Sequence, residues 1–343
     1  MPVLKNAKGK GVKIMKIGFC YDTKSDYGLQ EDNIEYTDFV SLKTVTEIKY
    51  ALERCGHVVE YIGNAQKLRN RLENKDLDVD LIFNIAEGFG SRNRETLVPG
   101  LLEVYNIPCT ASDVYAMALN LNKYHTKILA KSIGVPVPKD MCFKIVDKSI
   151  IKQVEELGYP FVLKLNSEGG SMGVTLIHNI QEFLKESSRL IENYHSEVLA
   201  EEYIPGKEIT VPIIGNGEQA KALGVVLILH EDGTDVSLYD CNMKSADNDI
   251  TNSLTTGLAP ETEDAILKYS LAIHRFFDLR DYSRMDFRVT PDGHPFFLEI
   301  NTMPSLGRDG SFELCAKSMD LEYHEIIGEI LRAAADRCHI NIK

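Results

Sequence analysis

The segment MDFRVTPDGHPFFLEIN, residues 285–301, constrains the fold most, because two alternating apolar runs flank an Asp-Gly pair. Such a pattern is the strongest short-range signal for a β-hairpin. Closing the hairpin on Asp292-Gly293, or on a four-residue loop around this pair, gives a single register. That register pairs apolar side chains on one face: Phe287 with Leu298, and Val289 with Phe296.

The other face of this hairpin places Asp286 opposite Glu299 and Arg284 opposite Asn301. Like charges that lie directly opposite each other destabilise a sheet, by about 1 kcal/mol in water and about 4 kcal/mol at an effective dielectric of 20. Two carboxylates and an amide are oxygen ligands of the kind that Mg²⁺ takes, and a dication would turn the repulsion into attraction. The alternative is a solvated sheet face whose carboxylates pair with Arg284 and Arg288.

Length and composition bound the class of protein. A chain of 343 residues suggests two or three domains. No run approaches the roughly 18 apolar residues of a membrane-spanning helix. The seven cysteines are scattered singly, without zinc-ligand or redox spacing, which favours reduced thiols in the cytoplasm. A net charge of −13 argues against a nucleic-acid partner, although it leaves room for a phosphate ligand held by local lysines.

The N-terminal part alternates strands and helices. Strands are expected in Lys16–Asp22, in HVVEYIG (57–63) and in DVDLIFNIAEG (78–88), with helices at Glu35–Arg54 and from Glu95 onward. This alternation predicts a doubly wound parallel sheet, whose ligands gather beyond the carboxyl ends of the strands. The segment EGFGSRNRE (87–95) follows the third strand, so it is expected either to contact a ligand or to form a solvated loop.

Beyond residue 118 the pattern changes to short strands separated by turns. YPFVLKLN and VTLIHN flank a glycine-rich turn, and SEVLAEEYIPGKEITVPII and KALGVVLILH add further strands. Mixed strands and helices predict α+β lobes. The expected division is an extension or tag at 1–15, a doubly wound α/β domain at 16–118, and α+β lobes at 119–205 and 206–343.

Two turns in this region suit a nucleotide. The glycines of SEGGSMG (167–173) would let backbone N–H groups approach phosphate oxygens, with Lys164 just before them. It is not a Walker A motif, since no GK[ST] follows, and a plain flexible hairpin is the alternative. In EEYIPGKE (201–208), Glu201 could accept from an amino group and Glu208 from ribose hydroxyls, unless the segment is a solvated acidic turn.

In combination these features resemble the ATP-grasp superfamily, and within it D-alanine–D-alanine ligase and its relatives. The resemblance spans about residues 16–335 and is most specific in YSRMDFRV and FLEINTMPSLG. The segment IFNIAEGFGSRNRETLVPGLLE also matches this group. The resemblance implies an ATP-grasp fold, in which the doubly wound domain precedes two α+β lobes that enclose ATP. It also implies an ATP-dependent ligase in the cytoplasm, with two Mg²⁺ (or Mn²⁺), amino-acid substrates and a homodimer.

The resemblance also assigns roles, residue by residue. Nucleotide contacts fall on Lys123, Lys164, Glu168, Gly169, Gly173, Glu201, Glu202, Tyr203, Ile204, Glu208 and Lys244. Metal ligands are Asp286, Glu299 and Asn301, and catalytic positions are Arg284, Lys244, Gly170 and Ser171. The substrate positions are Glu31, Glu95, Arg308 and Ser311. Arg308 is either a carboxylate clamp or a solvated loop arginine.

The sequence departs from the D-alanine ligase pattern at the amino-acid site. Gly170 stands where those ligases have a loop serine, and Ser245 stands where they have a tyrosine after the lysine. The first strand lacks the usual glutamate, which Glu31, Asp32 or Glu35 would replace. D-alanyl-D-alanine is therefore the first expectation for the product. A ligase for other amino acids, one that attaches an amino acid to a carrier, or a nucleotide-binding relative without catalysis remain alternatives.

Overall fold

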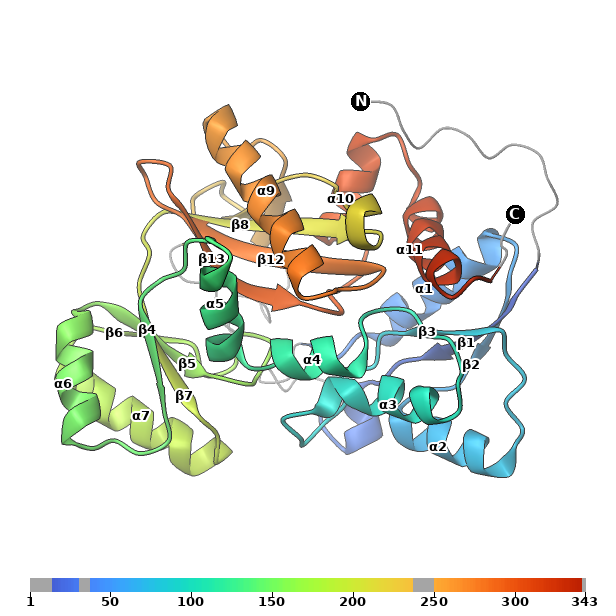
Figure 1. Cartoon of the computed structure of the whole chain (residues 1–343), viewed down its shortest axis with the longest axis horizontal. Coiled ribbons are helices and arrows are strands. Elements are labelled where there is room, and N and C mark those ends of the chain that lie inside the picture. Colours follow the sequence, from blue (N-terminus) through green and yellow to red (C-terminus); the bar gives the residue numbers. More distant parts are fainter. Residues whose placement is uncertain (1–13, 31–37, 237–249, 341–343) are drawn as a thin grey trace.

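Three sheets organise the chain in the computed structural model, which describes residues 14–30, 38–236 and 250–340 (Figure 1). A small parallel sheet lies near the N-terminus, an antiparallel sheet forms a separate lobe, and a larger sheet holds the C-terminal strands. Within these ranges, no helix combines the length and the apolar character that crossing a membrane requires.

The N-terminal sheet has the strand order β2-β1-β3, all parallel. Its strands are β1 (Lys16–Cys20), β2 (Val58–Tyr61) and β3 (Leu81–Asn84). One core joins a face of this sheet to α1 (Leu42–Arg54) and α11 (Tyr323–Arg337), and another lies toward α2 (Ala65–Asn74) and α3 (Leu97–Val104). Helices on both faces confirm the predicted doubly wound arrangement. The helix predicted between Glu35 and Arg54 begins at Leu42 within the described residues, where Ser41 caps α1 by accepting from the Thr44 backbone N–H.

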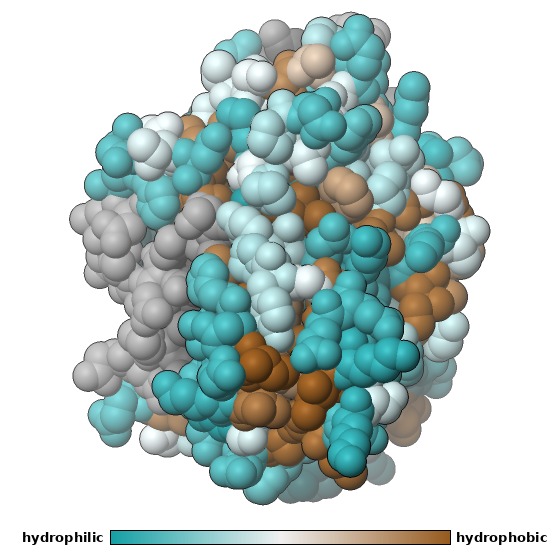
Figure 2. Space-filling model, turned by 90° about the vertical axis from the view of Figure 1, so that its left-hand side faces the viewer, coloured by the Kyte–Doolittle hydropathy of each residue, from teal (hydrophilic) through white to brown (hydrophobic). Residues whose placement is uncertain are grey.

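The second sheet has the antiparallel order β4-β7-β5-β6. Its strands are β4 (Asp140–Phe143), β5 (Phe161–Leu165), β6 (Thr175–Ile177) and β7 (Val198–Glu202). Helices α6 (Lys148–Leu157) and α7 (Ile180–Tyr194) cover one face, where Phe183 packs edge-on against Phe143 and Phe161. Figure 2 shows the outer side of this lobe, where apolar residues gather within a polar surround.

The third sheet has the order β11-β10-β8-β12-β13, with β9 paired to β8. Its strands are β8 (Lys207–Ile214), β9 (Lys221–Ala222), β10 (Val226–His230), β11 (Ile250–Ser253), β12 (Tyr282–Val289) and β13 (Pro295–Asn301). An apolar core joins one face of this sheet to α9 (Pro260–Phe276) and α5 (Lys123–Ser132). Two further helices are α4 (Val114–Asn120) and α10 (Ser311–Ser318). Helix α5 thereby places Lys123 beside the second and third sheets.

The β12–β13 hairpin follows the predicted register at one end only. Asp286 pairs with Glu299 and Arg284 with Asn301, as expected, but Phe287 pairs with Phe297 and Val289 with Pro295. The predicted partners Leu298 and Phe296 are therefore wrong. The turn closes on Thr290 and His294, so it has three residues rather than two or four, and Gly293 adopts φ +87° at its end. A bulge between the Asp286 and Phe287 pairs compensates for the odd loop length and turns Leu298 toward the polar side.

A buried ion pair ties the last helix to the third sheet. Asp281, just before β12, accepts from Arg337 Nε at 3.0 Å and from Arg337 Nη2 at 2.7 Å, and its side chain is fully buried. Arg337 also donates to the Cys109 carbonyl at 2.7 Å. One guanidinium therefore joins the end of α11, the entrance to β12 and the segment after α3.

We expect Arg337→Leu to lower the free energy of unfolding by about 3–5 kcal/mol, because it leaves the Asp281 carboxylate buried without its cation. Urea denaturation measures the loss. The matched control is Arg332→Leu on the same helix, where the pair with Glu329 is partly solvent-exposed and its removal should cost less than about 1 kcal/mol. Equal effects of the two substitutions would contradict the anchoring role of Arg337.

Candidate active site

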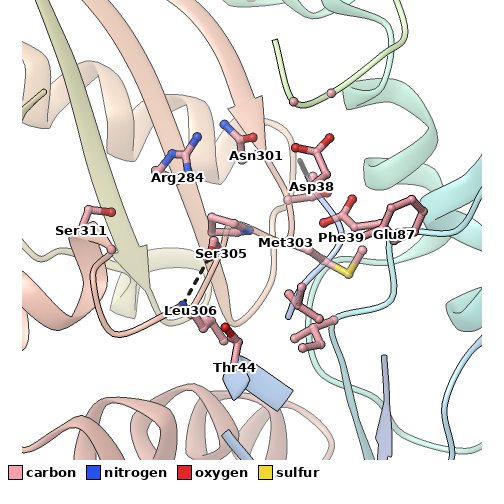
Figure 3. Close-up of a pocket in the computed structure, with 18 of the residues that line it drawn as sticks. Asp38, Phe39, Thr44, Glu87, Arg284, Asn301, Met303, Ser305, Leu306 and Ser311 are labelled. Atoms are coloured by element: carbon pink, nitrogen blue, oxygen red, sulfur yellow. Dashed lines mark hydrogen bonds between the residues drawn. The ribbon is translucent and has the colours of Figure 1, made fainter. Parts of the chain in front are cut away.

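Two cavities meet at the polar face of the β12–β13 hairpin. The first, which we call the large cavity, has a volume of about 590 Å³ and lies among the loop after β3, the start of α1 and the loop after β13. The second, which we call the inter-lobe cavity, has a volume of about 90 Å³ and lies between the second and third sheets. Arg284 and Glu299 line both. Figure 3 shows Arg284 and Asn301 between Ser311 on one side and Asp38 and Glu87 on the other.

Asp286 is held by three neighbours, one on its own strand and two on adjacent strands. Arg284 donates to both of its oxygens, at 2.9 and 2.8 Å, Thr210 Oγ1 donates at 2.6 Å, and Asn301 Nδ2 donates at 2.8 Å. Because strand residues two apart share a face, Arg284 and Asp286 are placed together by β12 itself. The bidentate guanidinium neutralises one member of the opposed carboxylate pair.

The second member, Glu299, pairs with a lysine from a distant part of the chain. Lys123 Nζ lies 3.2 Å from Glu299 Oε2 and donates to the Glu168 carbonyl at 2.7 Å. Lys123 is the first residue of α5, so the helix start delivers its ammonium to the hairpin and to the glycine-rich loop. The two carboxylates of the hairpin are thus each matched by a separate cation.

These residues fit a hard divalent cation. Among the described residues, no three His, Cys, Asp or Glu side chains gather as ligands. The predicted set instead offers two carboxylates and one amide, and Mg²⁺ is commonly held by one or two carboxylates together with substrate phosphates and water. Asp286 and Glu299 lie directly opposite each other on neighbouring strands, with Asn301 beside Asp286. A cation could bind there once Arg284 and Lys123 release the carboxylates.

The floor of the inter-lobe cavity holds a buried carboxylate shared by two lysines. Glu201 Oε1 accepts from Lys164 Nζ at 2.8 Å, and Glu201 Oε2 contacts Lys127 Nζ. Lys127 also lies 2.8 Å from Asp140 Oδ2. Although burial alone would raise the pKa of Glu201, Lys127 and Lys164 outweigh it and hold this pKa below its usual value. Glu201 is therefore an anion in a buried setting.

Lys127 was missed as a site residue by sequence reasoning. The sequence did indicate that Lys127 lies near the site, because it follows Lys123 by four residues and so lies on the same face of α5. The contact itself joins positions 74 apart in the chain, which no local pattern reveals.

Glu208 lies at the other end of the inter-lobe cavity and is bound by Arg288. Arg288 Nη1 donates to Glu208 Oε2 at 2.9 Å, and the same guanidinium donates to the carbonyls of Ile204 at 2.8 Å and Gly206 at 2.7 Å. Burial raises the pKa of Glu208 to about 6 despite this cation. The predicted positions Glu202, Tyr203 and Ile204 line the same cavity, and Leu298 joins them because of the bulge.

The glycine-rich loop between β5 and β6 runs along both cavities. Gly170 and Ser171 adopt φ values of +62° and +59°, which favour glycine, and Gly173 adopts +70°. Gly169 and Glu168 line both cavities, Gly170 lines the large one and Ser171 the inter-lobe one. Gly173 is packed: a Cβ built there would lie 2.7 Å from Leu190 Cδ2.

Arg94 fixes this loop to the N-terminal sheet. Its Nη1 donates to the Ser167 carbonyl at 2.9 Å and lies 3.2 Å from Glu168 Oε2. Arg94 is buried and belongs to the segment that the sequence placed at the carboxyl ends of the parallel strands. The structure thus brings EGFGSRNRE against the glycine-rich loop.

The predicted substrate residues have different surroundings. Glu95 and Ser311 line the large cavity, and Glu95 accepts from Thr302 Oγ1 at 3.0 Å. Arg308 also lines it, but its guanidinium lies 3.6 Å from Glu313 and stacks over Tyr323. Glu31 and Lys244 lie outside the described residues.

Four further acidic residues that line the large cavity were missed: Asp38, Glu47, Glu87 and Asp309. Burial, together with the nearby Glu95 and Asp38 carboxylates, raises the pKa of Glu87 well above its usual value. Glu87 follows β3, so its position at the carboxyl end of a parallel strand was the available signal. Asp38 comes from just before α1 and carried none.

Comparisons with known proteins now bear on this geometry. A family model described as D-ala D-ala ligase C-terminus matches residues 129–332. The chain is 30% identical over 292 residues to the D-alanine–D-alanine ligase of Aquifex aeolicus, covering 85% of this chain and 94% of that protein. It is also 30% identical over 296 residues to the uncharacterized protein y4sG of Sinorhizobium fredii, covering 84% and 86%.

Two solved structures are similar. The D-alanine–D-alanine ligase from Bacillus anthracis is 25% identical, with a TM-score of 0.76 over 94% of this chain and 98% of that one. The VanG D-Ala:D-Ser ligase from Enterococcus faecalis is 19% identical, with a TM-score of 0.74 over 94% and 100%, and shows the fold alone. Together they confirm the predicted fold class, a parallel α/β sheet with α+β parts in an ATP-grasp arrangement.

We expect Arg94→Leu to speed amide hydrogen exchange in residues 166–173, because the guanidinium that holds the Ser167 carbonyl is removed. Mass spectrometry of exchanged peptides measures the effect. The control is Arg92→Leu, an exposed position two residues earlier, which should leave the loop unchanged. Unaltered exchange in Arg94→Leu would show that the loop is held by other contacts.

Proposed function

Because the chain belongs to the family described as D-ala D-ala ligase C-terminus, we propose that it is an ATP-dependent ligase that joins the carboxylate of one amino acid to the amine of another. The observation that carries this proposal is the face shared by Arg284, Asp286, Glu299 and Asn301, which lies where the large cavity meets the inter-lobe cavity. A phosphoryl group and an amino-acid carboxylate would meet at this face.

The inter-lobe cavity suits the nucleotide. Glu201 would accept from the adenine amino group, since a carboxylate has about four lone-pair sites and its two lysines leave room for another donor. Glu208 would accept from the ribose hydroxyls. Lys164 and Lys123 would approach the phosphates, with the glycine-rich loop over them. Lys244 would reach the terminal phosphate, as the resemblance implies.

Asp286, Glu299 and Asn301 would hold the two Mg²⁺ ions of the proposed enzyme. When bound, Mg²⁺ supplies charge neutralisation for the phosphate oxygens. Lys123 and Arg284, which pair with Glu299 and Asp286 in the structure, would then be available to phosphate and acyl oxygens.

Arg284 is the residue best placed to act on the reacting atoms. It lines both cavities and lies on the polar face of the hairpin, where they meet. The phosphorylated carboxylate and the tetrahedral species formed by amine attack carry negative charge on oxygen, and a guanidinium aimed at these oxygens stabilises them. The carboxylate of the second amino acid would lie near Ser311, with Gly170 and Ser171 covering the site.

The amino-acid pair is the finer part of the proposal. The Aquifex aeolicus and Bacillus anthracis relatives are named as D-alanine–D-alanine ligases, which makes D-alanyl-D-alanine the first candidate product and cell-wall synthesis its first candidate role. Gly170 and Ser245 depart from the pattern of those ligases. Another amino-acid pair is therefore the second candidate. The same proposal includes a cytoplasmic location and a homodimer, by analogy with the family.

The proposal is tested by phosphate release from Mg·ATP with D- and L-amino acids, singly and in pairs, followed by mass spectrometry of the products. Amino-acid-dependent release and a product of the mass of the matching amide are expected. No release with any amino acid, together with Mg²⁺-dependent nucleotide binding, would favour a relative without catalysis.

We expect Arg284→Ala to lower kcat by at least about 100-fold while ATP affinity stays within a few-fold, because the guanidinium acts on charge that develops during the reaction. Turnover kinetics and a nucleotide-binding titration measure the two effects. Arg275→Ala, a partly exposed residue in the last turn of α9, is the control and should keep full turnover. Lost ATP binding with surviving turnover would contradict the role of Arg284.

We expect Asp286→Asn to raise the Mg²⁺ concentration needed for half-maximal turnover by about tenfold or more, because a ligand charge is lost at the metal site. The matched control is Asp292→Asn in the turn of the same hairpin, where the carboxylate is exposed. A Mg²⁺ titration distinguishes the two variants. An unchanged titration for Asp286→Asn would remove Asp286 from the metal site.

A further inference from the structure

A third cavity, of about 120 Å³, adjoins the large cavity, and we call it the side cavity. The two share part of their walls: Asp38, Phe39, Glu87, Arg94, Glu168 and Gly169. Because the two cavities share these walls, the side cavity is an extension of the large cavity, and a substrate bound in the large cavity could place a side chain there.

Carboxylates outnumber cations in its walls. Asp38, Glu87 and Glu168 line the side cavity, and among the described residues that line it Arg94 is the one cationic side chain. Arg94 is already engaged, by the Ser167 carbonyl and by Glu168. Asp38 lies against the same loop, since a Cβ built on Gly169 would be 2.0 Å from Asp38 Oδ2. Three carboxyl groups thus share one guanidinium in the walls of the side cavity.

Hydrogen bonds to a buried aspartate hold the backbone at Glu87, which lines the side cavity. Asp22, which is 1% exposed, accepts from the backbone N–H groups of Glu87 at 3.0 Å and Gly88 at 2.7 Å, and from the Tyr27 hydroxyl at 2.9 Å. Within the described ranges, the Glu87 carboxylate itself has neither a hydrogen bond nor an ion pair. Burial and the neighbouring Glu95 and Asp38 carboxylates raise its pKa, and Arg94 offsets this only in part.

Aromatic rings complete the side cavity. Phe39 and Phe89 line it, and both pack on Tyr27, with ring centroids 5.4 and 5.1 Å apart. Figure 3 shows Phe39 at the same end of the site as Asp38 and Glu87. Ring faces attract cations and pack against methylene stems. A neutral apolar side chain would leave the carboxylates desolvated and unpaired, which is costly.

We propose that one of the two amino acids joined by this enzyme carries a cationic side chain, an ammonium or guanidinium on an aliphatic stem, that enters the side cavity between Phe39 and the carboxylates of Asp38 and Glu87. This inference rests on the proposed ligase function, which supplies the reaction, and it adds the chemical class of one substrate. The large cavity would then distinguish its substrate by the charge of the side chain. A loop serine would not serve this purpose here, since Gly170 stands at its position.

The test compares lysine with norleucine, which has a similar aliphatic chain without the terminal ammonium, in both stereochemical forms. Phosphate release from Mg·ATP gives kcat/KM for each, with every amino acid of the panel offered as the second substrate. We expect kcat/KM for lysine or its shorter or guanidinium-bearing homologues to exceed that for norleucine by about 10- to 150-fold, the range for a hydrogen-bonded charge. In Glu87→Gln this ratio should fall to within a few-fold of one.

Glu103→Gln, an exposed glutamate on α3, is the matched control and should keep the wild-type ratio. Unchanged nucleotide affinity of Glu87→Gln establishes that the variant is folded. A wild-type preference for alanine or norleucine over the cationic amino acids would overturn the proposal. So would a preference for the cationic amino acid that survives in Glu87→Gln.

Failure of the ligase function is distinguishable from failure of this inference. If no amino acid causes phosphate release, the ligase proposal fails, and calorimetric titration of lysine and norleucine in the presence of Mg·ADP decides the side cavity alone. Binding of lysine at least tenfold tighter than norleucine, lost in Glu87→Gln, supports the cationic side chain. Equal binding, or none, overturns it.

Discussion

Two carboxylates face each other across the β12–β13 ladder, and each is neutralised by a different cation. Arg284 comes from the same strand as Asp286, whereas Lys123 reaches Glu299 from the start of α5. Bringing that lysine to the hairpin requires α5 to pack against the third sheet and the glycine-rich loop to lie beside it. The Lys123–Glu299 pair, together with the apolar contacts of α5, thus links the hairpin to the glycine-rich loop, and a bound dication would change the ion partners without changing the scaffold.

Charge is divided between the two cavities that meet at this face. Buried lysines share Glu201 in the inter-lobe cavity, and Arg288 holds Glu208 there, so anions are matched where a nucleotide would bind. At the far end of the large cavity Asp38 and Glu87 exceed their cations.

Sequence reasoning succeeded where the signal was local. Strand periodicity placed Arg284, Asp286, Glu299 and Asn301 on one face, and the three-residue turn and its compensating bulge left that end of the register unchanged. It placed Leu298 on the apolar face of the hairpin, because the sequence does not distinguish an apolar residue at a bulge from one that faces the core. The contacts of Lys127, Asp38 and Glu87 are with residues far along the chain, so the weak local signals of Lys127 and Glu87 did not identify them as site residues. Turn length and long-range pairing are set by packing, which alternation and spacing do not encode.

The most direct measurement is a crystal structure of the complex with Mg²⁺ and a non-hydrolysable ATP analogue. The account predicts metal ions bound by Asp286, Glu299 and Asn301, with Lys123 and Arg284 turned from these carboxylates toward phosphate oxygens. It also predicts the adenine between the second and third sheets, beside Glu201. A nucleotide bound elsewhere, or one bound here while the Arg284–Asp286 and Lys123–Glu299 pairs persist without metal, would contradict it.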